Sequence, residues 1–292
     1  MITKLIDVTT IPGIHWYPNG QTALSGIPLM LASALDRLFQ SWAAQYDAKE
    51  YQFPPFIPAH ELARLDYFRS FPHLVTFPIT LDPGEANLSK FAEGEPMNAA
   101  GELQLTIPSP ISNVMTPAAC YHCYVRHQGE TMHAPTYLTT RATCFRRESV
   151  YAPLERQWSF SMREIVCIGT ADEVKAFLKH FQQHIDEFFQ QLRLPIEWKA
   201  ANDPFFNPSH NPKYLAQKLD PVKTEMVFQN HLAIGSINFH RNYFGEAFGI
   251  RRDGKEAFTG CVAFGIERWL FACLAQFGTE YALWPAPIRQ GA

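Results

Sequence analysis

The chain has 292 residues, 47% of them hydrophobic and 18% charged, so it can bury a large core and is not a disordered protein. Its 25 basic and 28 acidic side chains give a formal charge of −3. Proteins that grip a nucleic-acid backbone usually carry a basic excess, so this charge argues against tRNA or DNA as the main partner.

The first elements predicted along the chain are a helix and a strand. No secretory signal precedes them, and the apolar run 27–35 is cut by Asp36, so we expect a cytoplasmic protein without a membrane span. Apolar residues at helical spacing predict a helix over 28–46. Three prolines in 50–58 cannot continue a helix and favour an edge strand, a candidate surface for a homodimer.

The middle of the chain predicts an antiparallel hairpin. Residues 60–93 show a mixed helix and strand pattern, and 94–110 are a turn-rich connection. Strands are predicted at 139–150 and 157–169, and only a short loop separates them. Antiparallel pairing follows, because two strands joined by a short loop cannot run parallel.

A strongly amphipathic helix is predicted over 171–192, with Thr170 and Asp172 as candidate caps. Residues 201–219 are polar and turn-rich, and they predict a surface excursion with a short helix at 212–219.

The last third of the chain returns to strands. Residues 226–239 have strand character, and 260–277 switch from strand to helix at Gly265. Strands joined mainly by hairpins, with helices outside them, predict an α+β fold on an antiparallel sheet. We expect one catalytic domain over residues 1–292.

Side-chain alternation makes the predicted hairpin informative. Phe160 and Glu164 share one face of the second strand, about 13 Å apart at about 3.3 Å per residue, and Arg146 and Glu148 share a face of the first. A ring and a carboxylate at that separation suit the two ends of a nucleotide-sized ligand. The alternative is an ordinary half-buried strand with Glu164 exposed.

Three segments resemble the motifs of class II aminoacyl-tRNA synthetases. The string CFRRE at 144–148, followed by Arg156 and QWSFSMRE, resembles motif 2, particularly of the seryl type. The string GCVAFGIERW at 260–269 resembles motif 3, and the proline-rich segment 50–58 behind its helix is similar to motif 1. The three stand in the order of that class and span about residues 25–280.

The resemblance implies a role for each matching residue. Arg146 would bind the α-phosphate of ATP and the substrate carboxylate, and Glu148 would face the adenine amino group. Phe160 would stack on one side of the adenine, and Arg268 would cover the other side near the γ-phosphate. Arg156 would contact the outer phosphates. Guanidinium groups suit bidentate phosphate binding, and a helix start favours anions. The alternative for Arg268 is a surface arginine paired with the neighbouring glutamate, residue 267.

The string PAACYHCY at 117–124 contains candidate metal ligands. Archaeal-type seryl-tRNA synthetases and the amino acid:carrier protein ligases related to them hold zinc with cysteine, glutamate and cysteine, and the matching residues are Cys120, Glu164 and Cys261. Three protein ligands leave a fourth position open, and thiolates favour zinc. Cys120 and Cys123 also form a C-x-x-C that suits a redox pair, and we prefer Cys120 as the ligand by its motif position.

The candidate magnesium ligands differ from those of bacterial seryl-tRNA synthetases. Bacterial seryl enzymes place a magnesium-binding glutamate in the region where LAIGSIN has Ala233. Glu225 and Ser236 are the candidates for binding Mg²⁺ with ATP, and Asn238 is a candidate for either that role or contact with the amino acid.

The strings RQWSFSMREIVCIG, KLDPVKTEMVFQN and SINFHRNYFGEAFGI resemble those of amino acid:carrier protein ligases. The first motif begins near residue 28 and the third ends near 277, so we expect no tRNA-binding arm. This resemblance implies activation of glycine or alanine by ATP and transfer to the phosphopantetheine thiol of a carrier protein. The alternatives are a tRNA-charging seryl-type core and a non-catalytic regulator.

The excursion at 201–219 is our candidate for carrier recognition, and its alternative is a solvated loop without a partner. The residues expected to face an acidic carrier are Lys213, Lys218, Phe205, Phe206 and Tyr214.

Overall fold

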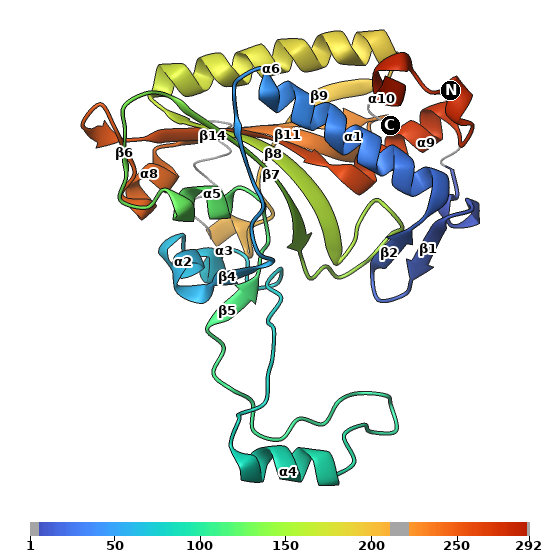
Figure 1. Ribbon diagram of the computed structural model, residues 1–292, viewed down its shortest axis with the longest axis vertical. Helices are drawn as coiled ribbons and strands as arrows, with labels where there is room; N and C mark the ends of the chain where they lie inside the picture. The colour runs from blue at the N-terminus through green and yellow to red at the C-terminus, as the bar shows by residue number, and fades with distance from the viewer. Residues whose placement is uncertain (1–5, 211–221, 291–292) are drawn as a thin grey trace.

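A central antiparallel sheet organises the molecule (Figure 1). The computed structural model describes residues 6–210 and 222–290. Within them the sheet has seven strands in the order β3-β7-β8-β14-β11-β10-β9, and all neighbours are antiparallel except β3 and β7. The strands are β3 (Lys49–Tyr51), β7 (Thr136–Phe145), β8 (Ser159–Gly169), β9 (Ile196–Ala201), β10 (Lys223–Phe228), β11 (Leu232–Arg241) and β14 (Phe258–Gly265). The predicted α+β fold is confirmed.

Three long helices, α1 (Gly26–Ala44), α6 (Ala171–Leu192) and α9 (Ile266–Phe277), cover one face of this sheet (Figure 1). Alternate strand residues such as Ile165 and Phe264 point into this layer and are buried with the apolar faces of the helices. The main core therefore lies between sheet and helices, which leaves the opposite face of the central strands for the site.

Short helices cover part of that opposite face. At one end α5 (Tyr121–Arg126) and α8 (Tyr243–Phe248) pack over a second apolar cluster. The remaining short elements are η1 (Val8–Thr10), β1 (Ile14–Tyr17), β2 (Gln21–Leu24), α2 (Ala59–Arg64), α3 (Tyr67–Ser70), β6 (Thr131–Met132), η2 (Pro208–His210), β12 (Arg251–Arg252), β13 (Lys255–Glu256), η3 (Tyr281–Leu283) and α10 (Ala286–Gln290). Among the described helices, none is both long and apolar enough to cross a bilayer.

Residues 77–112 leave the body of the molecule, and we call them the arm. The arm starts beside the antiparallel pair β4 (Phe56–Pro58) and β5 (Asn113–Met115) and carries α4 (Glu85–Glu93) near its tip. Figure 1 shows its two extended segments running away from the sheet. The mixed strand and helix pattern at 60–93 gave no indication of such a projection.

Several predicted boundaries are wrong, each for a local reason. The segment 50–58 is two strands in two different sheets, because Pro54 and Pro55 cannot donate to a ladder. The first hairpin strand ends at Phe145, since the next residues leave it and Arg147 donates its backbone N–H to Leu74 O at 3.0 Å.

Two further segments differ from their predictions. The segment 226–239 is a hairpin of β10 and β11, in which Gln229 and Asn230 both have positive φ and form the turn. Helix α6 has the predicted bounds, and its cap is Thr170, whose hydroxyl accepts from Glu173 N while Glu173 accepts from Thr170 N. The other candidate cap, Asp172, lies in the first turn.

Candidate functional site

A cavity of about 510 Å³ opens over the sheet face that the long helices leave uncovered. Side chains from β8, β10, β11 and β14 form its floor, and the loops before α5 and after β7 form its walls. It is lined by all eleven residues that the sequence placed in the site, namely Cys120, Arg146, Glu148, Arg156, Phe160, Glu164, Glu225, Ser236, Asn238, Cys261 and Arg268.

Three arginines, Arg146, Arg156 and Arg268, converge on one part of this cavity, which we call the arginine end. Arg146 Nε donates to Pro117 O at 2.9 Å, and its guanidinium carbon lies 5.2 Å from the centre of the Phe160 ring. Burial, together with the charges of Arg146 and Arg156, lowers the pKa of Arg268. Clustered and partly desolvated cations of this kind suit a bound polyanion.

Arg268 is fixed by main-chain oxygens. Its Nε donates to Glu155 O at 2.7 Å, and its Nη1 donates to Ala233 O at 2.8 Å. The alternative pairing with Glu267 is wrong, because the Glu267 carboxylate accepts from the backbone N–H of Ser161 through both oxygens, at 3.0 and 2.9 Å. The guanidinium therefore faces the cavity from the start of α9.

Glu148 and Arg156 belong to the loop that follows β7. They form an ion pair, with Arg156 Nη1 2.9 Å from Glu148 Oε2. Glu148 therefore balances part of the positive charge at the arginine end, and the contact joins two positions of this loop through partly exposed side chains. Such a pair contributes little stability and is easily exchanged for contacts to a ligand.

The second part of the cavity, the thiol end, is formed by Cys120, Glu164 and Cys261. All three are buried, and their ligand atoms lie within 4.8 Å of one another. Strand register explains why Glu164 and Cys261 lie close together. Glu164 pairs with Ala263, and Cys261 lies two residues before Ala263 on the same strand, so it shares that face of the sheet. Cys120 immediately precedes α5, and the adjoining Ala119 N–H donates to Glu164 Oε1 at 3.2 Å.

The thiol end fits a cation. Glu164 Oε2 is buried and has no hydrogen-bond partner among the described residues. A hydrogen bond with Cys261, burial and the nearby Glu164 charge raise the pKa of the Cys120 thiol well above its usual range. A buried carboxylate beside two protonated thiols is costly, whereas a soft divalent cation satisfies all three groups. Cys123 is also buried but is outside this cluster of ligand atoms.

Between the two ends lie the candidates for magnesium and substrate contacts. Glu225 and Ser236 face each other across β10 and β11. Glu225 Oε1 lies 3.2 Å from Lys223 Nζ. Asn238 Nδ2 donates to Ser236 Oγ at 3.0 Å and to Cys261 Sγ at 3.3 Å. Asn238 thus joins this group to the thiol end.

Among the lining residues that sequence reasoning missed are His240 and Lys223. His240 Nε2 lies 3.8 Å from Cys261 Sγ, and burial lowers the pKa of His240 to about 4. Both omissions had a signal. In a strand, residues two apart share a face, so the candidates Ser236 and Asn238 add His240, and Glu225 adds Lys223.

The proposed carrier surface is only partly described. Phe205 was expected to face a partner, but it is buried and stacks on Phe71 with ring centres 4.9 Å apart. Phe206 is exposed, as expected. The short helix at 212–219 lies outside the described residues, together with Lys213, Tyr214 and Lys218.

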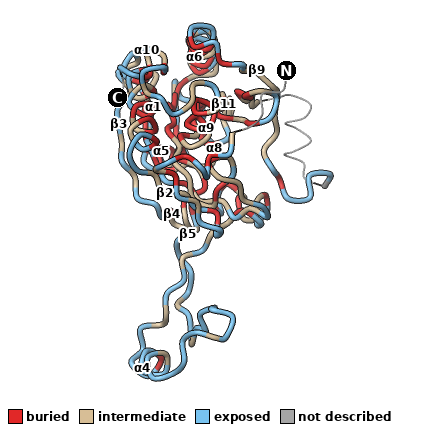
Figure 2. Tube along the Cα trace, turned by 90° about the vertical axis from the view of Figure 1, so that its right-hand side faces the viewer, coloured by how far each residue is buried: buried red, intermediate tan, exposed pale blue. Residues whose placement is uncertain are grey.

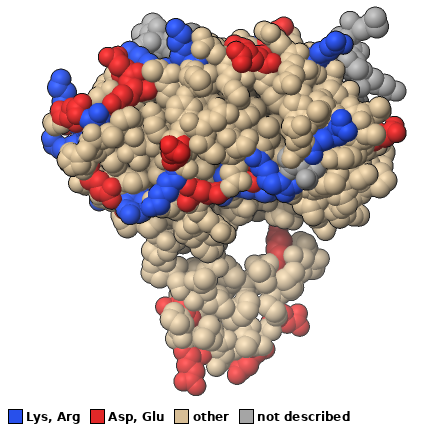
Figure 3. Space-filling model, turned by 45° about the horizontal axis from the view of Figure 1, so that its top comes forward, with Lys and Arg blue, Asp and Glu red and all other residues tan. Residues whose placement is uncertain are grey.

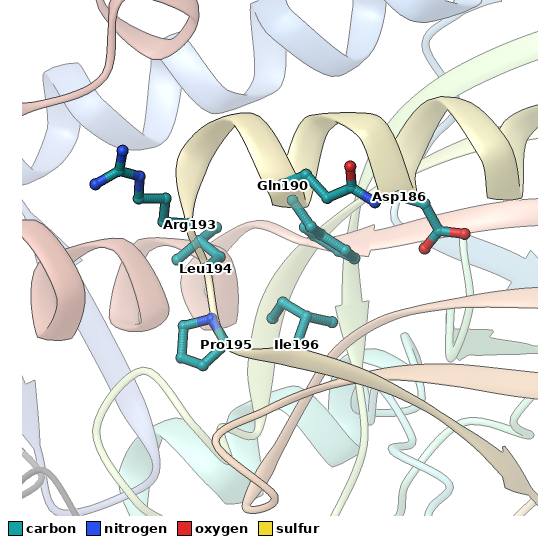
Figure 4. A pocket seen from close by; sticks show the side chains of 7 residues that line it. Asp186, Gln190, Arg193, Leu194, Pro195 and Ile196 are labelled. Atoms are coloured by element: carbon teal, nitrogen blue, oxygen red, sulfur yellow. The ribbon is translucent and has the colours of Figure 1, made fainter. Parts of the chain in front are cut away.

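A second hollow, of about 390 Å³, lies at the C-terminal end of α6 (Figure 4). Asp186, Arg193 and Ile196 contribute to its wall. Asp186 Oδ1 already accepts from Trp198 Nε1 at 2.6 Å, and no metal-ligand cluster of described residues lies there. The larger cavity is therefore the candidate active site.

Comparison with known proteins identifies the family of the chain. Residues 112–277 match the family model described as tRNA synthetase class II core domain (G, H, P, S and T). Two proteins of Bradyrhizobium diazoefficiens named amino acid–[acyl-carrier-protein] ligase 1 and 2 are 34% and 35% identical over 246 residues, which cover 82% of this chain and 74% and 72% of theirs.

Synthetases are more distant relatives. A type-2 serine–tRNA ligase of Methanopyrus kandleri is 26% identical over 82% of this chain and 50% of its own length. The solved structure of M. kandleri SerRS, in complex with A. aeolicus tRNASec, matches this chain with a TM-score of 0.78 at 21% identity. The match covers 95% of this chain and 57% of the SerRS chain. This likeness establishes the shared fold. The chain belongs to the amino acid–[acyl-carrier-protein] ligase family, built on the class II tRNA synthetase core.

Proposed function

We propose that this protein activates glycine or alanine with ATP as an aminoacyl adenylate and transfers the aminoacyl group to the phosphopantetheine thiol of a carrier protein. The observation that carries the proposal is a single cavity that joins an arginine cluster to a buried set of two thiols and a carboxylate. The names of the two Bradyrhizobium relatives support the reaction class.

Zinc is the ion that we propose for Cys120, Glu164 and Cys261. When bound there, it would supply an electrophilic anchor for the neutral amine of the amino acid. The orphaned Glu164 Oε2 and the two buried thiols support this assignment. Hydroxy acids and N-blocked amino acids would be rejected, because they offer no free amine.

The arginine end performs the first chemical step. Arg146 binds the α-phosphate and the substrate carboxylate, so that a carboxylate oxygen lies in line with the bond to the leaving pyrophosphate. That oxygen attacks the α-phosphorus, and the bond to the β-phosphate oxygen breaks. Arg268 holds the outer phosphates and stabilises the negative charge that develops there. Its two main-chain contacts keep it in position before ATP arrives.

Nucleotide recognition is assigned to the loop and strand beside these arginines. Phe160 offers a ring face to the adenine, and Glu148 accepts from the adenine amino group. Arg156, which pairs with Glu148 in the structure, is proposed to contact the outer phosphates. Glu225 and Ser236, opposite each other on two strands, are proposed to hold Mg²⁺ with ATP, since oxygen donors suit that ion.

The second step needs no nucleophile from the chain. The carrier's thiol sulfur attacks the carbonyl carbon of the adenylate, the bond to the phosphate oxygen breaks, and AMP leaves. The thiol end is proposed to select the amino acid, and Asn238 and His240 lie against Cys261 in this part of the cavity. An apolar pocket discriminates one methyl group by roughly 10 to 200-fold, so we expect glycine and alanine to compete.

The test is ATP–pyrophosphate exchange with glycine, alanine and serine, followed by mass spectrometry of a holo-carrier protein and by tRNA charging in parallel. We expect exchange with glycine or alanine, a carrier mass increased by the aminoacyl group, and no charged tRNA. Exchange with transfer only to tRNA would instead establish a tRNA-charging core, and an absence of exchange with every amino acid would establish a non-catalytic protein.

A further inference from the structure

The loop that carries the proposed nucleotide contacts rests on the N-terminal hairpin of β1 and β2. We call residues 146–158, between β7 and β8, the nucleotide loop. Figure 1 shows it reaching β2, although the two segments are far apart in the sequence. Trp158 N donates to Gly20 O at 2.8 Å, and the buried side chain of Gln157 accepts from the Thr22 hydroxyl. The hairpin therefore braces the nucleotide loop.

Tyr151 joins the hairpin to the residue that is proposed to recognise adenine. Its hydroxyl accepts from Glu148 N at 3.4 Å and from Arg147 Nη1 at 3.3 Å. Its ring is nearly parallel to that of Trp158, with 10° between the planes and 6.5 Å between the centres. The Arg147 guanidinium carbon lies 5.8 Å from the centre of the Tyr151 ring, a cation–π contact. The phenol thus holds the main chain of Glu148.

Gly20 sets the distance between the hairpin and the Tyr151 ring. It is buried and has a φ of +87°, a left-handed conformation that favours glycine. A Cβ at this position would lie 2.6 Å from both Cγ and Cδ2 of Tyr151. The backbone of residue 20 therefore packs directly against the ring, and a side chain there would displace it.

The second half of the nucleotide loop has anchors of its own. Leu154 is buried in the main core and has a φ of +59°. The carbonyl of the next residue, Glu155, accepts from Arg268. These contacts do not involve Tyr151, whereas the N–H of Glu148 is bonded to the Tyr151 hydroxyl. A change at Tyr151 is therefore expected to act first on Glu148.

The arm is not part of this arrangement. Trp158 Nε1 donates to Thr76 Oγ1 at 2.9 Å, directly before the arm begins, but no arm residue lines the cavity. Figure 2 shows the arm beyond this point almost entirely exposed. Its residues 77–112 include five acidic side chains and one lysine, and Figure 3 shows acidic groups at its sides and tip. Such a surface repels a polyphosphate, so we expect the arm to contribute nothing to the discrimination between nucleotides.

We propose that Tyr151 and Gly20 are positioning residues for adenine recognition. Neither lines the cavity, so each acts on a nucleotide only through the residues that it holds. Gly20 lets the hairpin hold the Tyr151 ring, and the Tyr151 hydroxyl holds the backbone of Glu148, which directs the Glu148 carboxylate at the adenine amino group. The inference rests on the proposed function for the role of Glu148. It extends that role to the selection of ATP over nucleotides that carry an oxygen at this position of the base.

Calorimetric titration of the full chain with ATP and with ITP tests the proposal. ITP presents an oxygen where ATP presents the amino group, so a well-placed carboxylate repels it, and we expect the wild-type chain to bind ATP on the order of 100-fold more tightly. Tyr151→Phe removes one neutral acceptor and should lower this ratio about fivefold. Gly20→Ala displaces the ring and should lower the ratio about tenfold or more. Tyr17→Phe is the matched control, since it removes a hydroxyl from the same hairpin at a side chain of a residue that is 51% exposed, and it should change the ratio less than about twofold.

The ratio of the two affinities distinguishes positioning from a merely structural role. A general loosening of the loop would weaken both nucleotides equally and leave the ratio unchanged, and that result overturns the proposal. An equal loss of discrimination in Tyr17→Phe, or a wild-type chain without preference for ATP, overturns it as well. Tyr151→Phe keeps the ring and decides the result if Gly20→Ala does not fold.

ATP–pyrophosphate exchange on the same samples reports the proposed function separately. A wild-type chain that prefers ATP to ITP but exchanges with no amino acid would contradict the proposed function. The effects of Tyr151→Phe and Gly20→Ala on the ratio would still decide the inference about positioning, because calorimetry measures nucleotide binding without the reaction.

Discussion

At the arginine end of the cavity the side chains are held by main-chain carbonyls and an exposed ion pair, whereas at the thiol end they are held by strand register and burial. The arginine end therefore stays open to a large, charged and exchangeable ligand. The thiol end is closed and suits an ion that remains in place. The difference indicates that nucleotide affinity and amino acid selection can be changed independently, and the following substitutions test this separation.

The largest effect is expected for Cys261→Ala. Removal of one of the two sulfurs leaves too few donors for zinc, so metal content should fall to background and exchange should drop by more than about 1,000-fold. Metal analysis and exchange kinetics provide the measurements. Cys167→Ala is the matched control, because Cys167 is equally buried on the helix side of the same sheet. Full exchange in a metal-free Cys261→Ala protein would remove zinc from the proposal.

Arg268→Ala should lower the maximal rate of exchange by about 100 to 1,000-fold, because a fixed cation beside the leaving phosphates is lost. Zinc content should stay at the wild-type value, which distinguishes this end from the other. Arg251→Ala, a change at an exposed arginine, should leave both quantities unchanged. Unchanged exchange kinetics in Arg268→Ala would refute the assigned role.

Phe160→Ala is expected to raise the KM for ATP about tenfold, since stacking on a base contributes about 1–3 kcal/mol. The KM for the amino acid should change by less than about threefold, because Phe160 lies at the arginine end. Steady-state exchange with each substrate varied in turn measures both constants. An equal rise in both would show that the two ends are coupled.

The smallest effect is expected on the helix-covered face of the sheet, which carries neither the arginine end nor the thiol end. Thr170→Ala removes one half of the capping box of α6 and should lower the free energy of unfolding by about 1 kcal/mol, with both KM values unchanged. Urea unfolding measures the loss. Asp172→Ala, in the first turn of the same helix, should cost less. A change in substrate affinity would show that the helix layer communicates with the site.

Much of the fold was predictable because its signals are local. The amphipathic pattern and capping residues gave α6 its bounds, and Gly265 marked the passage from β14 to α9. The errors occur where a local backbone constraint interrupts a strand-like pattern. Pro54 and Pro55 divide a predicted strand between two sheets, and the turn at Gln229 and Asn230 requires positive φ from residues other than glycine.

The site was predicted more fully than the arm. Its residues were placed by resemblance to synthetase motifs, and strand alternation could have added His240. The arm gave no comparable signal, because its helix and strand segments read as ordinary parts of the body. Its apolar residues could not be distinguished from core residues without knowing that the chain projects there.

The two carbonyls that hold Arg268 have a consequence for how this protein tolerates sequence change. Both acceptors belong to the backbone, so replacing the side chain at residue 155 or 233 leaves the hydrogen bonds available. The guanidinium can therefore keep its place when the side chain at either position is exchanged for another.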